Sequence, residues 1–253
     1  MIICLRMLII NADDLGEFEL ATDSILSCHR RRLITSASAM VFMADSERAA
    51  EAASTANLET GLHLNLDRPF TAREVPPRLR GLQAAVADYL NSWKGAHVVY
   101  NPLLDRGFHD VFRYQYDAYC LLYGKEPAFI NGHHHRHLCM NMLAGRVIPL
   151  GLRVRRDFSP ERGDLRSVRG WYRRLVDRYL VRRHPCTDWF FSIEPTDDRP
   201  RFEWIIQRAD TSVVELMVHP AKAGQLTFLM GAYYRSQIDR VLRGPFNTLP
   251  AKG

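Results

Sequence analysis

Four histidines fall within five positions of the segment INGHHHRHL, residues 130–138. They are His133, His134, His135 and His137. Imidazole side chains bind transition metals and transfer protons near neutral pH, so a metal site, proton-transfer chemistry and a chance surface cluster are the three interpretations. Because the run is internal and follows the apolar residues Phe129 and Ile130, we expect at least one of these histidines to bind a metal or take part in catalysis.

Short apolar segments that are typical of β-strands alternate with helical patterns along the chain. The expected strands are residues 7–11, 34–42, 60–66, 128–133, 152–155, 188–193 and 212–219. The expected helices are about 18–31, 45–54, 109–123, 138–147, 167–182 and 232–243. This alternation predicts an α/β protein with about seven parallel strands, either a (β/α) barrel or an open doubly wound sheet.

We find no linker or internal repeat, so we treat residues 1–253 as a single domain. The least regular region is 67–105, which contains four prolines. We interpret it as an irregular excursion over the mouth of the barrel.

Polar side chains lie at or near the carboxyl ends of several expected strands. They are Asp13, Asp14, His63, Asn65, His133, His135, His137, Arg153, Glu215 and His219. Each has a plainer interpretation alone, such as a helix cap or a half-buried strand residue. Because active sites of barrels and open α/β sheets form at this edge, the coincidence predicts one composite site. If the chain stays extended after residue 132, alternation puts His133, His135 and His137 on one side and His134 on the other.

These residue types suit metal-dependent hydrolysis. One carboxylate and two imidazoles, completed by water, favour Zn²⁺, and Co²⁺, Ni²⁺ or Mn²⁺ would also fit, whereas Mg²⁺ usually prefers oxygen ligands. A second carboxylate could accept a proton from water, and a histidine on the far side could protonate a leaving amine. Asp13, Asp14, His63, His133 and His219 supply these parts.

The composition restricts the protein class without identifying it. The 253 residues carry a formal net charge of +6, which is compatible with an anionic substrate. The five cysteines are scattered and odd in number, which is typical of reduced intracellular thiols. The apolar N-terminus is too short to span a bilayer and lacks a cleavage site. We therefore expect a cytoplasmic protein.

An arginine-rich segment occupies residues 153–183, with eleven arginines and four acids. Val168, Trp171, Leu175 and Tyr179 recur within it at helical spacing. One interpretation is a core-facing helix with a solvated basic face. The other is a patch for a phosphate-bearing substrate or a lipid surface. We expect no nucleic-acid partner, because no recognition motif accompanies the charge.

Several motifs together resemble the YdjC-like carbohydrate deacetylase family. They are NADDLG (11–16), LITSASAMV (33–41), GLHLNL (61–66), INGHHHRHL (130–138) and ELMVHPA (215–221), in the family's order. The resemblance implies a distorted (β/α) barrel that removes N-acetyl groups from amino sugars with one divalent metal. The sequences ITSAS and INGHHH most resemble those of family members that act on sugar-bearing lipids.

The resemblance also implies roles for individual residues. Asp13 would be the general base and His219 the general acid. Asp14, His63 and His133 would be the metal ligands. His135 and His137 would line the substrate pocket, and we add Asn65, Arg153 and Glu215 as expected substrate-binding residues.

Three positions depart from the family pattern, and alternatives to the deacetylase remain. Asn131 replaces a common Asp, Leu15 a common Phe and Ala221 a common Gly. Loss of the charge at Asn131 could weaken metal binding.

The expected partner is an N-acetylated sugar or glycoconjugate, with phosphate- or lipid-bearing forms, membrane-surface contact and a homodimer as further options. The alternatives are another metal hydrolase on the same barrel, such as a phosphoesterase, and a non-catalytic sugar- or lipid-binding protein.

Overall fold

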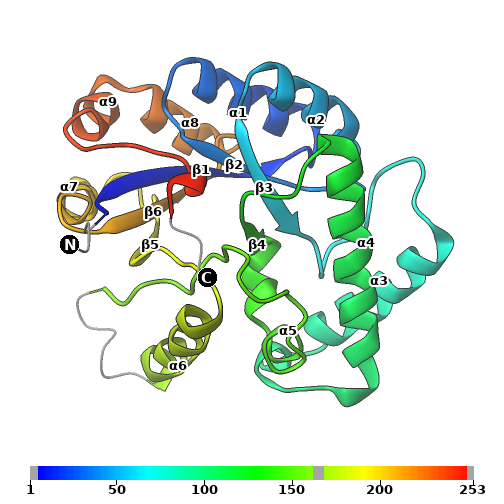
Figure 1. Cartoon of the computed structure of the whole chain (residues 1–253). Helices are drawn as coiled ribbons and strands as arrows, with labels where there is room; N and C mark the ends of the chain where they lie inside the picture. The colour runs from blue at the N-terminus through cyan, green and yellow to red at the C-terminus, as the bar shows by residue number, and fades with distance from the viewer. Residues whose placement is uncertain (1–4, 162–167, 250–253) are drawn as a thin grey trace.

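Six parallel β-strands form a curled sheet at the centre of the molecule (Figure 1). The structure is a computed structural model that describes residues 5–161 and 168–249. The strands are β1 (Met7–Leu15), β2 (Ser36–Ala39), β3 (Glu59–Leu64), β4 (Ile130–Gly132), β5 (Trp189–Ser192) and β6 (Val213–Val218). Their order is β4-β3-β2-β1-β6-β5, so β1 and β2 lie in the middle. Strands covered on both faces should be continuously apolar, and residues 7–10 of β1 are all buried.

The sheet is a half-barrel with six strands, so the expectation of about seven was wrong by one. The expected strand at 152–155 makes a single bridge, between Val154 and Ile130, in the described chain. The segment runs irregularly between β4 and β5. The amide of Ile130 donates to the Arg153 carbonyl oxygen at 2.8 Å, and the amide of Ser159 donates to the Phe190 carbonyl oxygen at 3.0 Å. A segment this rich in arginine has few apolar side chains for a regular strand to bury, so a loop fills the gap in the barrel.

Helices surround the sheet, as Figure 1 shows. Those that connect the strands are α1 (Glu19–Arg30), α2 (Ser46–Thr55), α3 (Pro77–Asn91), α4 (Asp105–Tyr123), α5 (Met140–Ala144), α6 (Val168–Arg183) and α7 (Arg199–Arg208). After β6 come α8 (Ala223–Met230) and α9 (Ala232–Ile238). Short 3₁₀ turns are η1 (Ala96–Val98), η2 (Pro102–Leu104), η3 (His133–Leu138) and η5 (Phe246–Thr248). None of the helices within the described ranges combines the length and apolar composition needed to cross a bilayer.

The region 67–105 is more regular than expected, because α3 occupies its centre. Two of its four prolines mark the start of this helix, where Pro77 takes the first position and loses no hydrogen bond. Leu79, Val86 and Leu90 are buried at helical spacing. The helix packs against α4. The expectation that the whole region is irregular was therefore wrong. Arg68, at the start of the region, does reach the cavity described below.

Helix α6 forms where expected but presents a different side to the core. Trp171 and Leu175 were expected to face inward, and they are 61% and 45% exposed. Val176 and Leu180 are buried instead. The buried carboxylate of Asp177 belongs to this inner side, where it binds Arg156 at 2.5 Å. The side chain of Val168 lies outside the described residues.

Candidate active site

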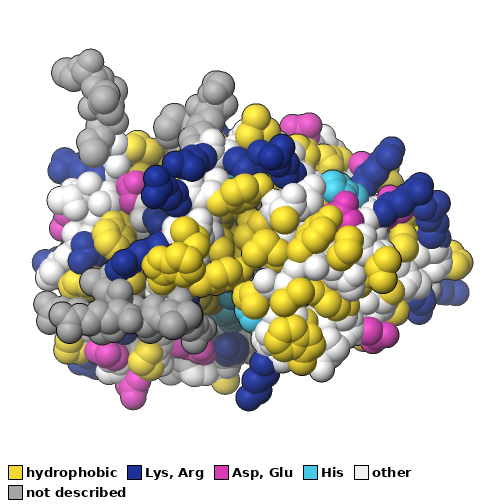
Figure 2. Space-filling model, turned by 90° about the horizontal axis from the view of Figure 1, so that it is seen from below, with side chains coloured by type: hydrophobic (Ala, Val, Ile, Leu, Met, Phe, Trp, Pro, Cys, Tyr) yellow, Lys and Arg dark blue, Asp and Glu magenta, His cyan; other side chains and the backbone are white. Residues whose placement is uncertain are grey.

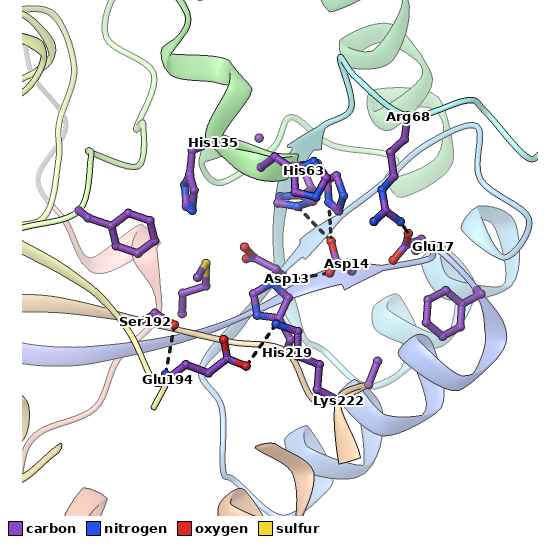
Figure 3. A pocket seen from close by; sticks show the side chains of 17 residues that line it. Asp13, Asp14, Glu17, His63, Arg68, His135, Ser192, Glu194, His219 and Lys222 are labelled. Atoms are coloured by element: carbon purple, nitrogen blue, oxygen red, sulfur yellow. Dashed lines mark hydrogen bonds and ion pairs between the residues drawn. The ribbon is translucent and has the colours of Figure 1, made fainter. Parts of the chain in front are cut away.

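The carboxyl ends of β1, β3, β4 and β6 surround a cavity of about 490 Å³ (Figure 3). Six of the residues expected from the sequence line it: Asp13, Asp14, His63, His133, His135 and His219. They come from four separate elements of the fold. The composite site at this edge of the sheet is therefore assembled from the segments that the motifs identified.

The end of β1 is distorted where the two aspartates stand. Ala12 pairs with Ala37, but Leu15 pairs with Ala39, so the register shifts across Asp13 and Asp14. Asp14 also has a φ of 74°, a left-handed conformation that costs energy for a residue with a Cβ. The irregularity gives the two neighbouring carboxylates different surroundings, as bulges near active sites often do.

Strand register brings His63 beside β4. His63 pairs with Asn131, and Leu64 pairs with Gly132. The strands approach closely because Gly61 has no side chain: a Cβ there would lie 2.5 Å from the carbonyl oxygen of Phe129. The pairing sets His63 next to the histidines that follow Gly132.

The histidine run is coiled, so the expected alternation along an extended chain was wrong. Residues 133–138 form η3, and His134 and His135 have φ angles of 50° and 58°. The turn sends the four rings in different directions. His133 faces Asp14, His134 bonds Asp67 at 3.0 Å, and His135 lines the cavity.

Asp14, His63 and His133 form a cluster that fits a divalent cation. One donor atom of each lies within 4.8 Å of the other two. Asp14 Oδ1 is 3.2 Å from His63 Nε2 and 3.0 Å from His133 Nδ1. The buried Nε2 of His133 has no hydrogen-bond partner within the described chain. One carboxylate and two imidazoles are a donor set suited to Zn²⁺ and similar ions.

The electrostatics of the cluster also favour a cation. Burial alone would raise the pKa of Asp14, but hydrogen bonds from His133 and His63 hold it well below its usual value. Burial alone would lower the pKa of His63, and the charges of Asp13 and Asp14 raise it instead. The cluster of Asp14, His63 and His133 therefore holds positive charge readily, whether as a proton or as a metal ion.

Asn131 contacts the ring of His63 from behind. Its Oδ1 is 2.7 Å from His63 Nδ1, and its Nδ2 donates to Ser38 Oγ at 2.7 Å. Rotating the amide by half a turn would make it donate to His63 and accept from Arg155 Nη2 at 3.0 Å. The orientation selects the tautomer of His63, because a ring that binds metal through Nε2 must carry its proton on Nδ1. An Asn can therefore orient this ring without the charge of an Asp.

Asp13 is held by a set of donors that leaves it ionised. Arg155 binds it through two bonds, Nη1 to Oδ2 at 2.6 Å and Nη2 to Oδ1 at 2.8 Å. Asn11 Nδ2 and Ser38 Oγ donate to Oδ1 at 3.0 and 2.9 Å. Burial raises the pKa of Asp13, but the opposing charge of Arg155 is among the effects that leave it below its ordinary value.

Arg155 was missed by the sequence analysis, which chose Arg153. Arg155 is fully buried and also donates to Glu215 Oε1 at 2.6 Å. Arg153 instead donates to the carbonyl oxygen of Leu249 at 2.7 Å and does not line the cavity. We expected Arg153 to bind substrate, and its position does not support that role. A regular strand at 152–155 would have put both arginines on one side. The irregular backbone separates them.

Three other expected substrate-binding residues are buried beside the cavity and do not line it. Glu215 pairs with Arg155, and burial raises its pKa to about 7 against the lowering effect of that arginine. His137 Nε2 lies 3.1 Å from the Arg155 carbonyl oxygen, and burial lowers its pKa to about 3. Asn65 bonds the backbone amide and carbonyl of Arg68. These three support the site from behind.

His219 stands across the cavity from the histidine run. Its Nε2 is 3.7 Å from Asp14 Oδ2, and its backbone amide donates to Gln225 Oε1 at 2.6 Å. Asp14 is thus a carboxylate that can orient the ring of His219. Burial lowers the pKa of His219, against the raising effect of Asp13 and Asp14.

The cavity is also lined by residues that the sequence analysis did not select as site residues. They are Glu17, Phe18, Arg68, Phe158, Ser192, Glu194, Met217 and Lys222. Two ion pairs stand among them, Arg68 with Glu17 at 2.8 Å and Lys222 with Glu194 at 3.2 Å (Figure 3). Glu194 directly follows an expected strand, so the strand-end rule could have found it. Nothing in the sequence marked Arg68 or Phe158.

Solved structures with similar folds support the architecture. One is a protein from Enterococcus faecalis V583 to which cellobiose-phosphate cleavage has been attributed, with a TM-score of 0.66 and 18% identity, covering 96% of this chain and 98% of that one. Another is the catalytic domain of peptidoglycan N-acetylglucosamine deacetylase from Eubacterium rectale, with a TM-score of 0.50 and 11% identity, covering 98% of this chain and 91% of that one. At these identities the likeness concerns the fold alone.

Sequence relatives give more specific evidence. Chitooligosaccharide deacetylases from Yersinia pestis (strain Pestoides F) and Yersinia pseudotuberculosis (serotype O:1b) are each 27% identical over 247 residues, covering 90% of this chain and 87% of theirs. The family model described as YdjC-like protein matches residues 7–240. The chain therefore belongs to the YdjC-like protein family.

Proposed function

We propose that this protein is a metal-dependent hydrolase that removes the acetyl group from an N-acetylated amino sugar or its conjugate. The observation that carries the proposal is one cavity in which a carboxylate–imidazole cluster stands beside a second carboxylate and a separate histidine. The relatives named chitooligosaccharide deacetylases support the substrate class.

Asp14, His63 and His133 would hold the ion, with Zn²⁺ as the expected metal and Mg²⁺, Co²⁺, Ni²⁺ or Mn²⁺ as alternatives. When bound there, a divalent ion would polarise the acetamide carbonyl and lower the pKa of water. Asn131 would fix the ring of His63 through Nδ1, 2.7 Å away.

Asp13 would accept the proton from the attacking water. Its bonds to Arg155 keep it ionised, so it is ready to accept a proton throughout the physiological range. Those bonds also lower the basicity of Asp13, so the arginine that orients the carboxylate also limits its strength as a base. Arg155 would fix the direction of the carboxylate through both of its oxygens.

His219 would protonate the departing amine. It faces the cluster from β6, whereas His63 and His133 come from β3 and β4. A histidine must be cationic at the start of the reaction to act in this way. Because burial lowers the pKa of His219, its acid form should be lost as the pH rises through a value below the usual histidine range.

His135 would contact the sugar as a neutral ring. Burial first, and then the charge of Arg155, hold its pKa well below the usual value. Its buried Nδ1 has no hydrogen-bond partner in the described part of the protein, so a substrate hydroxyl could bind there. The edge-to-face contact with Phe158, with centroids 4.5 Å apart, holds the ring in position.

The remaining partner and location assignments stay predictions. We expect a small N-acetylated sugar or glycoconjugate, with phosphate- and lipid-bearing forms as candidates, and no nucleic acid. A homodimer and a cytoplasmic location are also retained as predictions. Cys28, Cys120 and Cys139 carry free thiols.

A phosphoesterase on the same fold is the second candidate. Its support was the arginine-rich segment, but Arg155 and Arg156 are engaged with Asp13, Glu215 and Asp177. The cations at the rim, Arg68 and Lys222, are paired with acids as well. These pairs leave less positive charge for a phosphate than the sequence indicated.

The test is a mass-spectrometric screen of N-acetylated mono- and oligosaccharides, with phosphorylated counterparts as matched substrates. We expect loss of one acetyl group and release of acetate. Release of phosphate instead would support the phosphoesterase. A pure binding protein would retain its ligand affinity in Asp13→Asn and release neither product.

A further inference from the structure

The outward side of α6 combines apolar and basic side chains. Its exposed residues are Trp171, Arg174, Leu175, Arg178, Val181 and Arg182. Their spacing of three, one, three, three and one residues puts them on one side of a helix. We call this set the α6 face. Its large apolar members would be unusual on a purely solvated helix.

The α6 face carries positive charge without exposed acids. The one acid in the helix is Asp177, which is 7% exposed and binds Arg156. Arg178 and Arg182 therefore alternate with exposed apolar residues, and the only carboxylate within residues 168–183 points to the inner side of the helix.

A second group of exposed apolar residues lies near α6, in the segment 93–103. They are Trp93, Val98, Val99, Tyr100 and Leu103, with Leu103 91% exposed. Exposed Lys94 adds a further positive charge. Figure 2 shows hydrophobic side chains on both sides of a hollow in this face of the molecule.

The hollow lies beside the active site. A cavity of about 320 Å³ is lined by His97 from the segment and by Tyr172 and Arg173 from α6. His134, His135 and Phe158 line both this cavity and the active-site cavity. The exposed apolar residues therefore lie beside a cavity that shares part of its wall with the proposed reaction centre.

We propose that the α6 face and the segment 93–103 dock on the surface of an anionic lipid bilayer. Tryptophan and leucine side chains enter the interface between headgroups and acyl chains, while arginines bind lipid phosphates. A second copy of this chain fits the charge less well, because a two-fold interface centred on the α6 face would bring its arginines against their own counterparts. Docking would turn the hollow toward the headgroups. Docking would also present the active-site cavity to glycoconjugates held in the membrane, a step that rests on the proposed function.

The test is co-sedimentation of the full-length protein with vesicles of phosphatidylcholine alone or with about a third phosphatidylglycerol. We expect binding to the anionic vesicles, weakened by salt, and little binding to the neutral ones. Trp171→Ala with Leu175→Ala should reduce the partition coefficient at least about ten-fold, since both anchors are lost. Arg178→Gln with Arg182→Gln should reduce it about 25-fold, at roughly five-fold for each arginine.

The matched control is Leu242→Ala with Arg240→Gln, an exposed apolar and basic pair that follows α9. Figure 1 shows α9 on the opposite side of the sheet from α6. The control should bind like the wild type, and all variants should deacetylate a water-soluble substrate at the normal rate.

Absence of vesicle binding by the wild type, or equal binding by all variants, would overturn the proposal. So would a dimer in sedimentation equilibrium that the Trp171→Ala, Leu175→Ala variant breaks. Vesicle binding is measured without turnover, so its failure is distinguishable from failure of the deacetylase proposal.

Discussion

Two adjacent aspartates at the end of β1 have different neighbours, and this difference assigns their proposed roles. Asp13 contacts an arginine, an amide and a hydroxyl, whereas Asp14 contacts two imidazoles. A cation can replace the protons that the imidazoles share with Asp14, but it would be repelled by Arg155 beside Asp13. The neighbours thus favour Asp14 as the metal ligand and Asp13 as the proton acceptor.

Replacing Asp13 by asparagine should retain the metal and remove most of the activity. The amide keeps the shape of the side chain but cannot accept the proton, and general base catalysis typically contributes about 10²–10⁴-fold. Turnover and metal content should be measured on the same preparation. Asp210→Asn, at an exposed position, is the matched control and should behave like the wild type. More than a third of wild-type turnover in Asp13→Asn would mean that another group takes the proton.

His219→Ala should keep its metal and lose turnover with a changed pH dependence. The wild-type rate should fall as the pH rises and the cationic form of His219 disappears. Because the pKa of His219 is lowered by burial, this alkaline limb should begin below the ordinary histidine range. In the variant the limb should flatten while KM stays near normal. Loss of metal from the variant would instead identify His219 as a ligand.

Strand-end reasoning predicted the residues of the site that belong to regular strands or directly follow them. Asp13, Asp14, His63, His133 and His219 are all at the cavity. It failed for Arg155, because whether Arg153 or Arg155 turns inward depends on a backbone that the sequence pattern assigned to a strand. It also placed His137 in the substrate pocket, which His137 does not line. The turn that moves it away contains two left-handed residues, and a run of histidines gives no sign of such a turn.

At the scale of elements, the site depends on how tightly η3 follows β4. Gly132 makes this connection, and a Cβ there would lie 2.9 Å from the backbone nitrogen of His137. The extended backbone at Gly132 would accept any residue, so the restriction is space. Close packing of backbone against backbone cannot be relieved by rotating a side chain.

Gly132→Ala should therefore displace η3 and weaken metal binding at least about ten-fold, because misplaced ligands typically cost that much. Isothermal titration with Zn²⁺ measures the change. Gly81→Ala in α3 is the matched control, since a Cβ there would meet nothing within 4 Å. It should bind metal normally and be slightly more stable, as alanine favours a helix. Equal affinities in the two variants would show that η3 tolerates the displacement.

Helix α3 shows why some elements escaped prediction. Prolines at 76 and 77 were interpreted as breaks, although a proline at the first position of a helix is favourable. In α6 the periodicity was detected but the inward side was misassigned. Its apolar set included Trp171 and Leu175, and periodicity alone cannot say which of two apolar sides meets the core.

For the whole molecule, Arg155 joins the segment that follows β4 to the neighbouring strands β1 and β6. It belongs to the irregular segment between β4 and β5, and its side chain binds Asp13 on β1 and Glu215 on β6. All three groups are buried. The charge of this arginine thus helps to close the half-barrel from within.

Arg155→Met should destabilise the fold by about 3–5 kcal/mol, because it leaves two buried carboxylates without their partner. Urea denaturation measures the loss. Glu215→Gln added to that variant should recover part of it, since one unpaired charge disappears. Arg113→Met, whose side chain is 81% exposed, is the control and should change stability little. A loss below about 1 kcal/mol in Arg155→Met would show that the gap is closed by other contacts.

Acetyl removal should require one divalent ion at Asp14, His63 and His133. The most direct measurement is acetate released from an N-acetylated chitooligosaccharide as Zn²⁺ is added to metal-stripped protein. We expect no acetate at first, a rise in rate that saturates at one equivalent, and no rise in the His63→Ala, His133→Ala double variant. Full acetate release by the stripped protein, or equal release by the double variant, would contradict this requirement for a metal ion.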